Sequence, residues 1–433
     1  MDLSLFNPWW KTSEVPSELL GMERHILNQV WAFIDYRQIA VLYGIRRAGK
    51  TTLMYQLISR LLTKKRVLPA RILYFSFDEL VTGLINLLED YSYQILRSPE
   101  PFADKTYLFL DEIQKLDDWP NQLKIIYDRY PGLKIIISGS ADLLLRKGAK
   151  ESLAGRFFDF SVSPFSFEEF IESKKVNIER NNETLYKREL KLLFREYLKM
   201  GGFIEAAEFS DNALRKYFKE SLLERVVFRD IPESFTINKP QVLFRLLQIC
   251  AQLPGMYLEY KNLGNDLKMD ERTLSNYISY LEYSFLARKL YNFSLNLLTS
   301  EKKLKRLYLA NTGFLWALSY REPDDPLVIE TYFANLLRSR FFYRSPQRDE
   351  VDFVLSYEDH ILPIEIKIRD RIRPRDLRSI VKFMNRFRCT RGLVISRDDD
   401  SLFRQANKLI TIIPYWRYWS LKKEISKFQS TIL

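Results

Sequence analysis

The stretch QIAVLYGIRRAGKTTL, from Gln38 to Leu53, decides the fold of the first part of the chain. It opens with an apolar run of strand length and ends in a pattern typical of an amphipathic helix. Between the two, Gly44 to Thr51 fits G-x-x-x-x-G-K-[ST], a loop that cradles phosphate groups when a strand precedes it and a helix follows. Both conditions are met, which raises the motif well above a chance match.

The chemistry of this loop suits a nucleoside triphosphate. Gly44 and Gly49 let the backbone curl so that N–H groups point at phosphate oxygens, and the following helix adds its positive dipole end. Lys50 is expected to reach the terminal phosphates, and the Thr51 hydroxyl to hold Mg²⁺. The predicted nucleotide-binding residues are Gly44, Ile45, Arg46, Arg47, Ala48, Gly49, Lys50, Thr51, Thr52 and Ser138.

Four further apolar runs of strand length follow, separated by helical patterns. They span residues 71–77, 106–112, 134–140 and 157–163. Continuous apolar strands that alternate with helices indicate a mostly parallel sheet covered on both faces. The sequence therefore predicts a P-loop NTPase sheet with the phosphate loop after its first strand.

Polar residues at the ends of the later strands complete the predicted nucleotide site. Asp111 is placed to hold Mg²⁺ and Glu112 to polarise the attacking water, because phosphoryl transfer needs both functions beside the phosphate loop. Ser138 or Ser140 is a candidate sensor of the terminal phosphate, although a polar strand end explains either serine nearly as well. Arg156 is a candidate to contact the γ-phosphate, in cis or across a subunit interface, and a surface ion pair is the equal alternative.

Several segments together resemble archaeal and bacterial AAA-like P-loop ATPases over nearly the whole chain. They are NPWW near the N-terminus, YGIRRAGKTTL (43–53), YLFLDEIQKL (107–116), IISGSADLL (136–144), LAGRFFDFSVSPFSFEEF (153–170) and GGFIE (201–205). The resemblance implies ATP and Mg²⁺ as cofactors, with Gly44, Gly49, Lys50, Thr51, Asp111 and Glu112 in the matching positions. It also implies a C-terminal winged helix followed by a restriction-endonuclease-like domain. One departure is Asn311, where the family often has Asp.

The middle of the chain also patterns as helical. Residues 165–230 are charged and helical, and residues 240–295 read as three helices followed by a strand, which suggests a winged helix. Asp270 is expected to cap the third of these helices. Its residues Arg272, Ser275, Asn276 and Tyr280 suit a nucleic-acid groove. A protein-binding or merely connecting role is nearly as well supported.

The stretch EVDFVLSYEDHILPIEIKIR, residues 350–369, reads as two strands around a turn. Side chains alternate faces along a strand, so Asp352, Glu365 and Lys367 are expected to share one face. An Asp followed by a turn and Glu-x-Lys is the core of the PD-(D/E)xK nuclease arrangement, in which two carboxylates hold Mg²⁺. Glu330, on a helix expected over residues 329–342, is a further candidate acid. The alternative is a half-exposed strand of ordinary polar composition.

Charge points to a polyanionic partner. The net charge is +12, and residues 301–433 hold 26 Lys and Arg against 17 Asp and Glu. Within that region, Arg369 to Arg397 carries ten basic and two acidic residues. Such a basic field favours nucleic acid, and DNA is the expected partner, although a solvated helix face explains the run alone.

These inferences predict an α/β chain of 433 residues in four parts. They are a P-loop ATPase domain (1–165), a helical lid or linker (166–235), a winged helix (236–300) and a restriction-endonuclease-like domain (301–433). The two cysteines favour a reducing compartment, the cytoplasm, and no apolar run is long enough to cross a membrane.

We expect a Mg²⁺-dependent ATPase coupled to nucleic-acid binding or cleavage. The candidate catalytic residues are Lys50, Glu112, Arg156, Asp352, Glu365 and Lys367, and the candidate metal ligands are Thr51, Asp111, Asp352 and Glu365. The alternative is a nucleotide-controlled signalling or scaffold switch that binds a protein partner, or a second copy of the chain, without cleavage.

Overall fold

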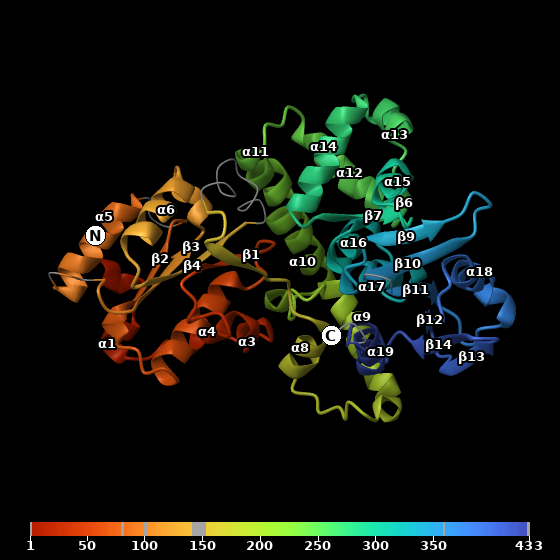
Figure 1. Cartoon of the computed structure of the whole chain (residues 1–433), viewed down its shortest axis with the longest axis horizontal. Coiled ribbons are helices and arrows are strands. Elements are labelled where there is room, and N and C mark those ends of the chain that lie inside the picture. Colours follow the sequence, from red (N-terminus) through yellow and green to blue (C-terminus); the bar gives the residue numbers. More distant parts are fainter. Residues whose placement is uncertain are drawn as a thin grey trace. The chain divides into compact units, whose positions relative to one another are not determined.

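The computed structural model describes residues 2–78, 82–98, 100, 102–140, 153–357 and 360–430. The chain divides into two compact units, Met1–Glu169 and Phe170–Leu433 (Figure 1). Each unit has its own sheet and is described by itself. Within the described part of the chain, no helix combines the length and apolar character that crossing a membrane requires.

The first unit is built on a five-stranded parallel sheet, as predicted. Its strands are β1 (Ile39–Tyr43), β2 (Ile72–Ser76), β3 (Thr106–Asp111), β4 (Leu133–Gly139) and β5 (Phe157–Ser161). They lie in the order β2-β3-β4-β1-β5, and every neighbouring pair is parallel. Because β4 lies between β1 and β3, the carboxyl ends of these three strands meet at one edge of the sheet.

Helices cover both faces of this sheet (Figure 1). The helices are α1 (Trp9–Thr12), α2 (Ser17–Leu20), α3 (Ile26–Trp31), α4 (Lys50–Thr63), α5 (Leu84–Tyr91) and α6 (Trp119–Arg129). Helices α5 and α6 bury Leu87, Trp119 and Leu123 against alternate strand residues such as Val41 and Leu110. Helices α3 and α4 lie on the opposite face, so the strands are buried on both sides, as continuous apolar runs require.

The N-terminal segment fastens the edge strand β2. The buried Asn7 side chain donates to the Tyr74 carbonyl at 3.0 Å and accepts from the Tyr74 N–H at 2.7 Å. The indole N–H groups of Trp9 and Trp10 both donate to the Ile72 carbonyl, at 3.1 and 2.9 Å. These contacts satisfy backbone groups that an open sheet edge would leave unpaired.

The second unit begins with helices, as the sequence predicts. Helix α8 (Phe167–Ser173) crosses the boundary between the units and is followed by α9 (Lys187–Met200), α10 (Asp211–Lys216), the π-helical segments Tyr217–Glu224 and Val226–Asp230, and α11 (Ile231–Ser234). The hydrogen bonds of Asn311 account for Asn at this position, where Asp was expected. Its amide donates to the Gly201 carbonyl at 2.7 Å and its oxygen accepts from the Gly313 N–H at 2.8 Å. An ionised Asp would lack the donor.

The predicted three-helix unit is present. Its elements are α12 (Pro240–Gln252), β6 (Met256–Tyr257), α13 (Tyr260–Leu267), α14 (Glu271–Tyr283) and β7 (Ala287–Asn292). Helix α15 (Leu297–Lys302) and strand β8 (Lys305–Leu309) follow this unit. Asp270 caps α14 as expected, because its carboxylate accepts from the Thr273 N–H at 2.9 Å. Strands β7 and β6 both pair antiparallel with β8.

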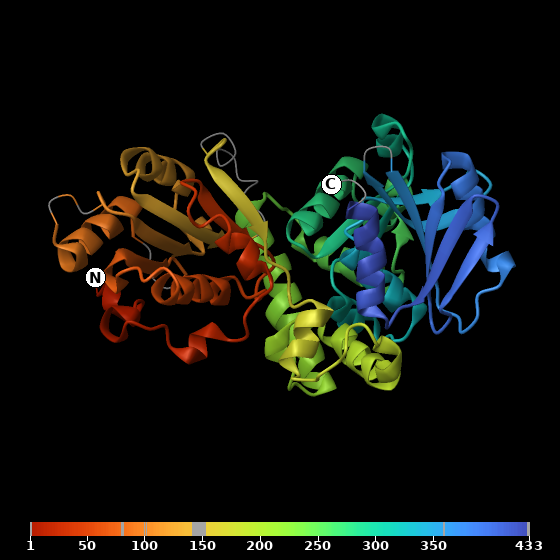
Figure 2. The same cartoon turned by 60° about the horizontal axis from the view of Figure 1, so that its bottom comes forward.

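These three strands continue into a nine-stranded mixed sheet (Figure 2). The remaining elements are α16 (Thr312–Ser319), α17 (Pro326–Leu336), β9 (Phe341–Arg344), β10 (Glu350–Tyr357), β11 (His360–Lys367), α18 (Arg378–Phe387), β12 (Arg391–Ser396), β13 (Ser401–Gln405), β14 (Lys408–Pro414) and α19 (Tyr418–Ser430). The sheet order is β13-β14-β12-β11-β10-β9-β7-β8-β6. Helix α18 buries Ile380 and Phe383 on the face that carries Val351.

One predicted boundary in this region is wrong. The helix expected over residues 329–342 ends at Leu336, and Phe341 to Tyr343 instead belong to β9, which pairs with β7 and β10. Aromatic residues favour strands, and pairing on both sides outweighs the helical periodicity that precedes them. Residues 358 and 359, in the turn expected between β10 and β11, lie outside the described residues.

Replacing Asn7 with Ala should lower the free energy of unfolding of the chain by about 2 kcal/mol, because the Tyr74 backbone groups lose their partners while remaining buried. Urea denaturation followed by tryptophan fluorescence measures the change. Asn121→Ala is the matched control, since Asn121 is exposed and its amide donates to Asp118, the residue before α6. Equal stability of the two variants would contradict this role of Asn7.

Candidate nucleotide site and acidic site

The phosphate loop is shaped by close backbone contacts. A Cβ atom at Gly44 would lie 2.1 Å from the Val162 carbonyl oxygen, so only glycine fits there. Gly49 has a φ of 87°, in the left-handed region that favours glycine, and α4 begins directly after it. The two glycines of the motif are therefore both required by the geometry of the loop.

Lys50 folds back over the loop that precedes it. Its ammonium donates to the Gly44 carbonyl at 3.1 Å and to the Ile45 carbonyl at 3.2 Å, and the residue is buried. These partners are neutral dipoles, so the positive charge of Lys50 is held at the loop without a carboxylate to neutralise it in these contacts. The Lys50 ammonium is therefore suited to bind an incoming anion.

Asp111 lies at the centre of the predicted metal site. Its Oδ2 accepts from the Thr51 hydroxyl at 2.6 Å and from the Tyr74 hydroxyl at 3.0 Å, and its Oδ1 accepts from the Ser138 hydroxyl. Asp111 and Ser138 are buried. The structure thus brings together Thr51, Asp111 and Ser138, which are predicted from three separate segments.

Tyr74 is a member of this cluster that the sequence reasoning missed. Burial, and then the charge of Asp111, raise the pKa of its hydroxyl, which therefore remains a donor to the carboxylate. The only signal in the sequence is a tyrosine within an otherwise apolar strand, which is ordinarily a core residue.

Glu112 occupies a backbone conformation that non-glycine residues seldom adopt. Its φ is 52°, and its N–H lies 3.2 Å from Asp111 Oδ1 and 3.3 Å from the Ser138 hydroxyl oxygen. Its side chain accepts from the Gln114 amide. Such strain, held by buried partners, is typical of functional sites.

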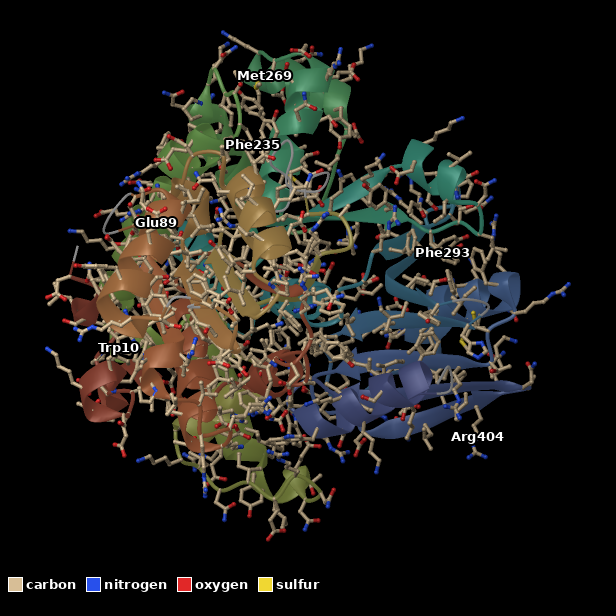
Figure 3. All side chains as sticks on the ribbon, turned by 60° about the vertical axis from the view of Figure 1, so that its left-hand side comes forward. Trp10, Glu89, Phe235, Met269, Phe293 and Arg404 are labelled. Atoms are coloured by element: carbon tan, nitrogen blue, oxygen red, sulfur yellow. The ribbon has the colours of Figure 1, made fainter. Side chains whose placement is uncertain are left out.

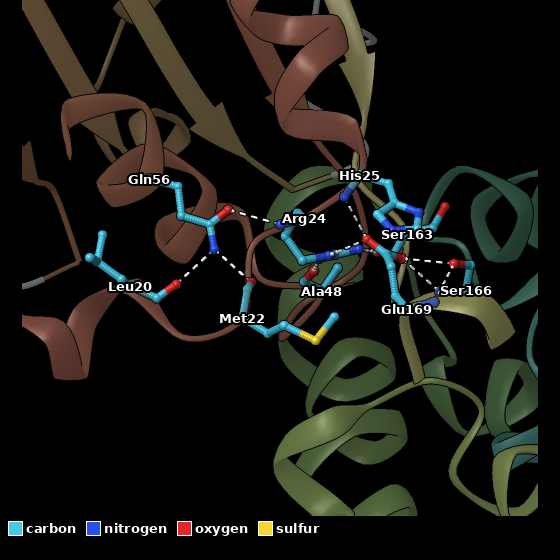
Figure 4. Close-up of polar contacts among 9 residues, drawn as sticks. All are labelled: Leu20, Met22, Arg24, His25, Ala48, Gln56, Ser163, Ser166 and Glu169. Atoms are coloured by element: carbon cyan, nitrogen blue, oxygen red, sulfur yellow. Dashed lines mark hydrogen bonds and ion pairs between the residues drawn. The ribbon is translucent and has the colours of Figure 1, made fainter. Parts of the chain in front are cut away.

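A buried ion pair between Arg24 and Glu169 supports the phosphate loop through the Ala48 carbonyl (Figure 4). The Arg24 guanidinium donates to Glu169 Oε1 at 3.0 Å, to the Ala48 carbonyl at 2.7 Å and to the Ser163 carbonyl at 2.7 Å. It also lies over the Phe165 ring, 4.5 Å from the ring centroid. Arg24 thus ties the loop to the segment that enters α8.

Further hydrogen bonds fix both partners of this pair. Glu169 accepts from the His25 N–H at 2.9 Å and from the Ser166 N–H at 2.8 Å, while Gln56 accepts from the Arg24 N–H at 3.1 Å (Figure 4). Burial alone would raise the pKa of the Glu169 carboxyl, but the Arg24 charge and these N–H donors outweigh it and hold the pKa below its ordinary value. Sequence reasoning singled out the segment SPFSFEEF without finding this role.

Arg156 is not brought to the phosphate loop within the chain. Its guanidinium pairs with Asp128, with Nε 3.2 Å from Oδ1, and its carbonyl accepts from the Ile39 N–H. That contact places Arg156 at the start of β1, whereas the loop follows the end of that strand. A role across a subunit interface stays a prediction, as do the roles of Arg46, which approaches Asp78 at 4.0 Å, and of Arg47, Thr52 and Ser140.

The acidic site lies on adjacent strands of the second unit. Strands β10 and β11 pair Phe353 with Ile364, so Asp352, one residue before Phe353, and Glu365, one residue after Ile364, lie next to this pair on adjacent strands. Lys367 Nζ lies 2.5 Å from Glu365 Oε1, and the Ile366 N–H donates to Asp352 Oδ2 at 2.8 Å. Glu365 is only 3% exposed, which excludes an ordinary solvated strand face at this position.

Arginine also enters this site. Arg306 Nη2 lies 2.9 Å from Glu330 Oε1 and its Nη1 lies 3.8 Å from Asp352 Oδ1, while the Tyr308 hydroxyl donates to Glu330 at 2.6 Å. Burial, and then the charge of Asp352, raise the pKa of Glu330. Arg306 is a member of the site that could not be selected from the sequence pattern, because it comes from a strand outside the motif.

Burial is also the main cause of the raised pKa of Glu365, which reaches about 7 although Lys367 opposes the shift. Glu365 Oε2 is buried without a hydrogen-bond partner among the described residues, so it has capacity for a cation. Within those residues, however, no group of three or more His, Cys, Asp or Glu side chains is gathered to hold a metal ion. Mg²⁺ at Asp352 and Glu365 stays a prediction that rests on two protein ligands.

A cavity of about 880 Å³ in the first unit lies between α5 and α6 and is lined by residues such as Tyr93, Arg97 and Ile125. None of its lining residues belongs to the phosphate loop. The candidate nucleotide site is therefore defined by the loop and strand ends and not by this cavity.

Family comparisons divide the chain into three matched segments. A family model described as an AAA domain matches residues 36–171, and domains of unknown function match residues 191–325 (DUF8612) and 327–418 (DUF4143). The first match supports an AAA-like P-loop ATPase domain in the first unit. The family suggests ATP hydrolysis.

Two curated relatives are similar over most of their length. An uncharacterized protein of Methanocaldococcus jannaschii is 27% identical over 402 residues, which cover 89% of this chain and 88% of that protein. An uncharacterized protein of Haemophilus influenzae is 24% identical over 362 residues, which cover 81% and 87%.

Two solved structures are also similar to the chain. A Walker-type ATPase of Pyrococcus abyssi has a TM-score of 0.40 at 16% identity, covering 70% of this chain and 97% of that one. The ORC1 protein of Aeropyrum pernix, in complex with DNA, has a TM-score of 0.31 at 15% identity, covering 74% and 97%.

Replacing Glu169 with Gln should lower the free energy of unfolding by about 3 kcal/mol near neutral pH, because Arg24 stays buried without its counter-charge. The pKa of Glu169 is depressed in the folded chain, so its stabilisation is full above the unfolded pKa and is lost as pH falls through the folded pKa. The difference between the two proteins should therefore shrink in acid.

Urea titrations across the acidic range measure this difference. The matched control is Glu172→Gln, which removes an exposed partner of Arg180 on the same helix. A gap between wild type and Glu169→Gln that does not change with pH would refute the assignment.

Glu365 should also make the free energy of unfolding depend on pH, but in the opposite direction to Glu169. Its folded pKa is raised to about 7, so between the unfolded pKa and pH 7 the folded chain binds a proton that the unfolded chain has released. As pH rises through this window, wild type should lose roughly 3 kcal/mol, and Glu365→Gln should not.

Thermal unfolding in a chelating buffer between pH 5 and about 8 covers this window. The exposed Glu322→Gln serves as control and should keep the wild-type pH profile. Parallel profiles of wild type and Glu365→Gln would show that the buried carboxyl does not titrate as described.

Proposed function

We propose that the chain is a Mg²⁺-dependent ATPase whose second unit binds nucleic acid. The observation that carries the ATPase part is the convergence of Lys50, Thr51, Asp111 and Glu112 on one edge of the five-stranded sheet. Thr51 and Asp111 are hydrogen-bonded to each other at 2.6 Å, which fits a shared cation. Mg²⁺ held there would neutralise phosphate charge.

Other residues of the site would bind the phosphates and activate the attacking water. The Lys50 ammonium would exchange its carbonyl partners for phosphate oxygens, and the curled backbone from Gly44 to Gly49 would bind the phosphate chain through its N–H groups. The Glu112 carboxylate would orient the attacking water and accept its proton. Ser138, hydrogen-bonded to Asp111, would hold that carboxylate in position.

We also propose that residues 236–300 form a winged helix, and residues 301–433 a restriction-endonuclease-like domain. The helix–strand–helix–helix order from α12 to α14, followed by strand β7, supports the first. The order α17-β9-β10-β11-α18-β12, with Asp352 and Glu365 on adjacent strands, supports the second. The basic segment from Arg369 to Arg397 supports a polyanionic partner.

One observation favours a second candidate function. Arg306 and Lys367 already contact the carboxylates of the acidic site, so a divalent cation would have to compete with them. That arrangement suits a nucleotide-controlled switch that binds a partner without cleavage.

Lys50→Ala should weaken Mg²⁺-ATP binding at least about tenfold, because charge-assisted hydrogen bonds to phosphate are lost. Isothermal titration calorimetry measures the affinity. Lys64→Ala, at the exposed end of the same helix, should bind as wild type does. Glu112→Gln should retain ATP binding and lose hydrolysis. Equal ATP affinity of Lys50→Ala and Lys64→Ala would remove the nucleotide proposal.

Nucleolytic activity is tested by incubating labelled DNA with wild type and Mn²⁺ or Mg²⁺. If the acidic site cleaves, Asp352→Asn and Glu365→Gln should each abolish product without weakening DNA binding by a comparable factor. Cleavage that persists in both variants shows that Asp352 and Glu365 do not form the catalytic site. Salt-dependent DNA binding without any product supports the switch.

A further inference from the structure

One edge of the nine-stranded sheet gathers strand ends from different parts of the second unit. Strands β7 and β9 are parallel, and their last residues, Asn292 and Arg344, are joined by two hydrogen bonds of 3.0 Å. Strand β10 runs antiparallel to both β9 and β11. Its first residue, Glu350, and the last residue of β11, Lys367, therefore lie at this same edge.

A pocket of about 510 Å³ opens at this edge, and its charged lining is entirely basic. Lys303 precedes β8, Arg344 and Arg348 flank the turn between β9 and β10, and Arg386 comes from α18. The pocket thus lies where the segment between α15 and β8, the turn after β9 and helix α18 come together.

The cations of this pocket are only partly neutralised. Arg344 Nε lies 3.1 Å from Glu350 Oε1, and the nearby Asp349 pairs with Lys382 at 2.8 Å. Across the described residues, no ion pair is recorded for Lys303, Arg348 or Arg386. Burial, and then the charge of Arg386, lower the pKa of Lys303. Like charges gathered in one pocket are relieved by a bound anion.

Phosphate is the anion that fits this donor set. Guanidinium groups offer a planar fork of donors to phosphate oxygens, and an ammonium adds a compact charge. The same edge continues through Lys367 to the exposed Arg369, Arg371 and Arg373. A row of cations along one edge suits a polymer with repeated phosphates better than a single small anion.

We propose that the pocket formed by Lys303, Arg344, Arg348 and Arg386 binds one phosphodiester group of a nucleic-acid backbone. The backbone follows this edge of the sheet toward Lys367, beside the acidic site. The inference rests on the proposed function, because it assumes that the second unit binds nucleic acid. It adds a specific phosphate contact outside the Asp352–Glu365 site.

The test uses the full chain, a fluorescein-labelled DNA duplex and a series of salt concentrations. Lys303→Gln combined with Arg386→Gln should weaken binding about tenfold, the order expected for lost charge-assisted hydrogen bonds. The slope of log affinity against log salt should fall by about 0.9, because one phosphate contact disappears. Arg348→Gln, at an exposed turn, tests the same pocket should the double variant fail to fold.

Arg404→Gln is the matched control. Arg404 is an exposed arginine on the edge strand β13, and Figure 3 shows it well apart from Phe293, the residue that follows Asn292. It removes a charge from the same unit outside the pocket. Its affinity and salt slope should stay close to those of wild type.

The outcomes separate the pocket from the proposed function. If wild type binds DNA and the pocket variants bind it with unchanged affinity and slope, the pocket inference is overturned while the proposed function stands. If wild type shows no salt-dependent DNA binding, the proposed function fails and takes the inference with it. If the variants lose binding of inorganic phosphate but not of DNA, the pocket takes a free anion and the inference is again overturned.

Discussion

The close approach of Gly44 to the Val162 carbonyl is the constraint on which the nucleotide site depends. It brings β5 against the start of the phosphate loop and leaves no room for a side chain, so the backbone must curl there. Arg24 then fixes the other end of the loop through the Ala48 carbonyl. Because Arg24 is itself held by Glu169, the loop is tied to α8, the helix whose residues continue into the second unit.

The geometry of the candidate nucleotide site could be predicted largely from the sequence because its parts are local. A strand, a curled loop and a helix follow one another from Gln38 to Thr63, and parallel pairing then brings the end of β3 beside them. The supporting pair Arg24 and Glu169 could not be found in this way. Its partners are 145 residues apart, and only the folded chain shows that both are buried.

The second unit was less predictable, for the same physical reason. Alternation along β10 and β11 identified Asp352, Glu365 and Lys367, but not that the strand face is buried under helix α17. The carboxylates are buried by residues distant in sequence, such as Tyr308 on β8 and Glu330 on α17. This burial changes the chemistry of the site. A solvated Glu365 would keep an ordinary pKa, whereas the buried carboxyl has a pKa of about 7.

The two sites hold their buried charges in different ways, and this difference bears on how readily each takes a ligand. Lys50 is held by carbonyl dipoles, so an incoming phosphate replaces weak partners with a full opposite charge. Glu365 Oε1 is held by Lys367, so a cation that binds this oxygen must displace a full charge that is already paired. Displacing an ion pair in a buried site costs more than displacing neutral dipoles. If, as proposed, a nucleic-acid phosphate attracts Lys367 away from Glu365, that cost falls, and binding of the backbone at this edge then favours a cation at the acidic site.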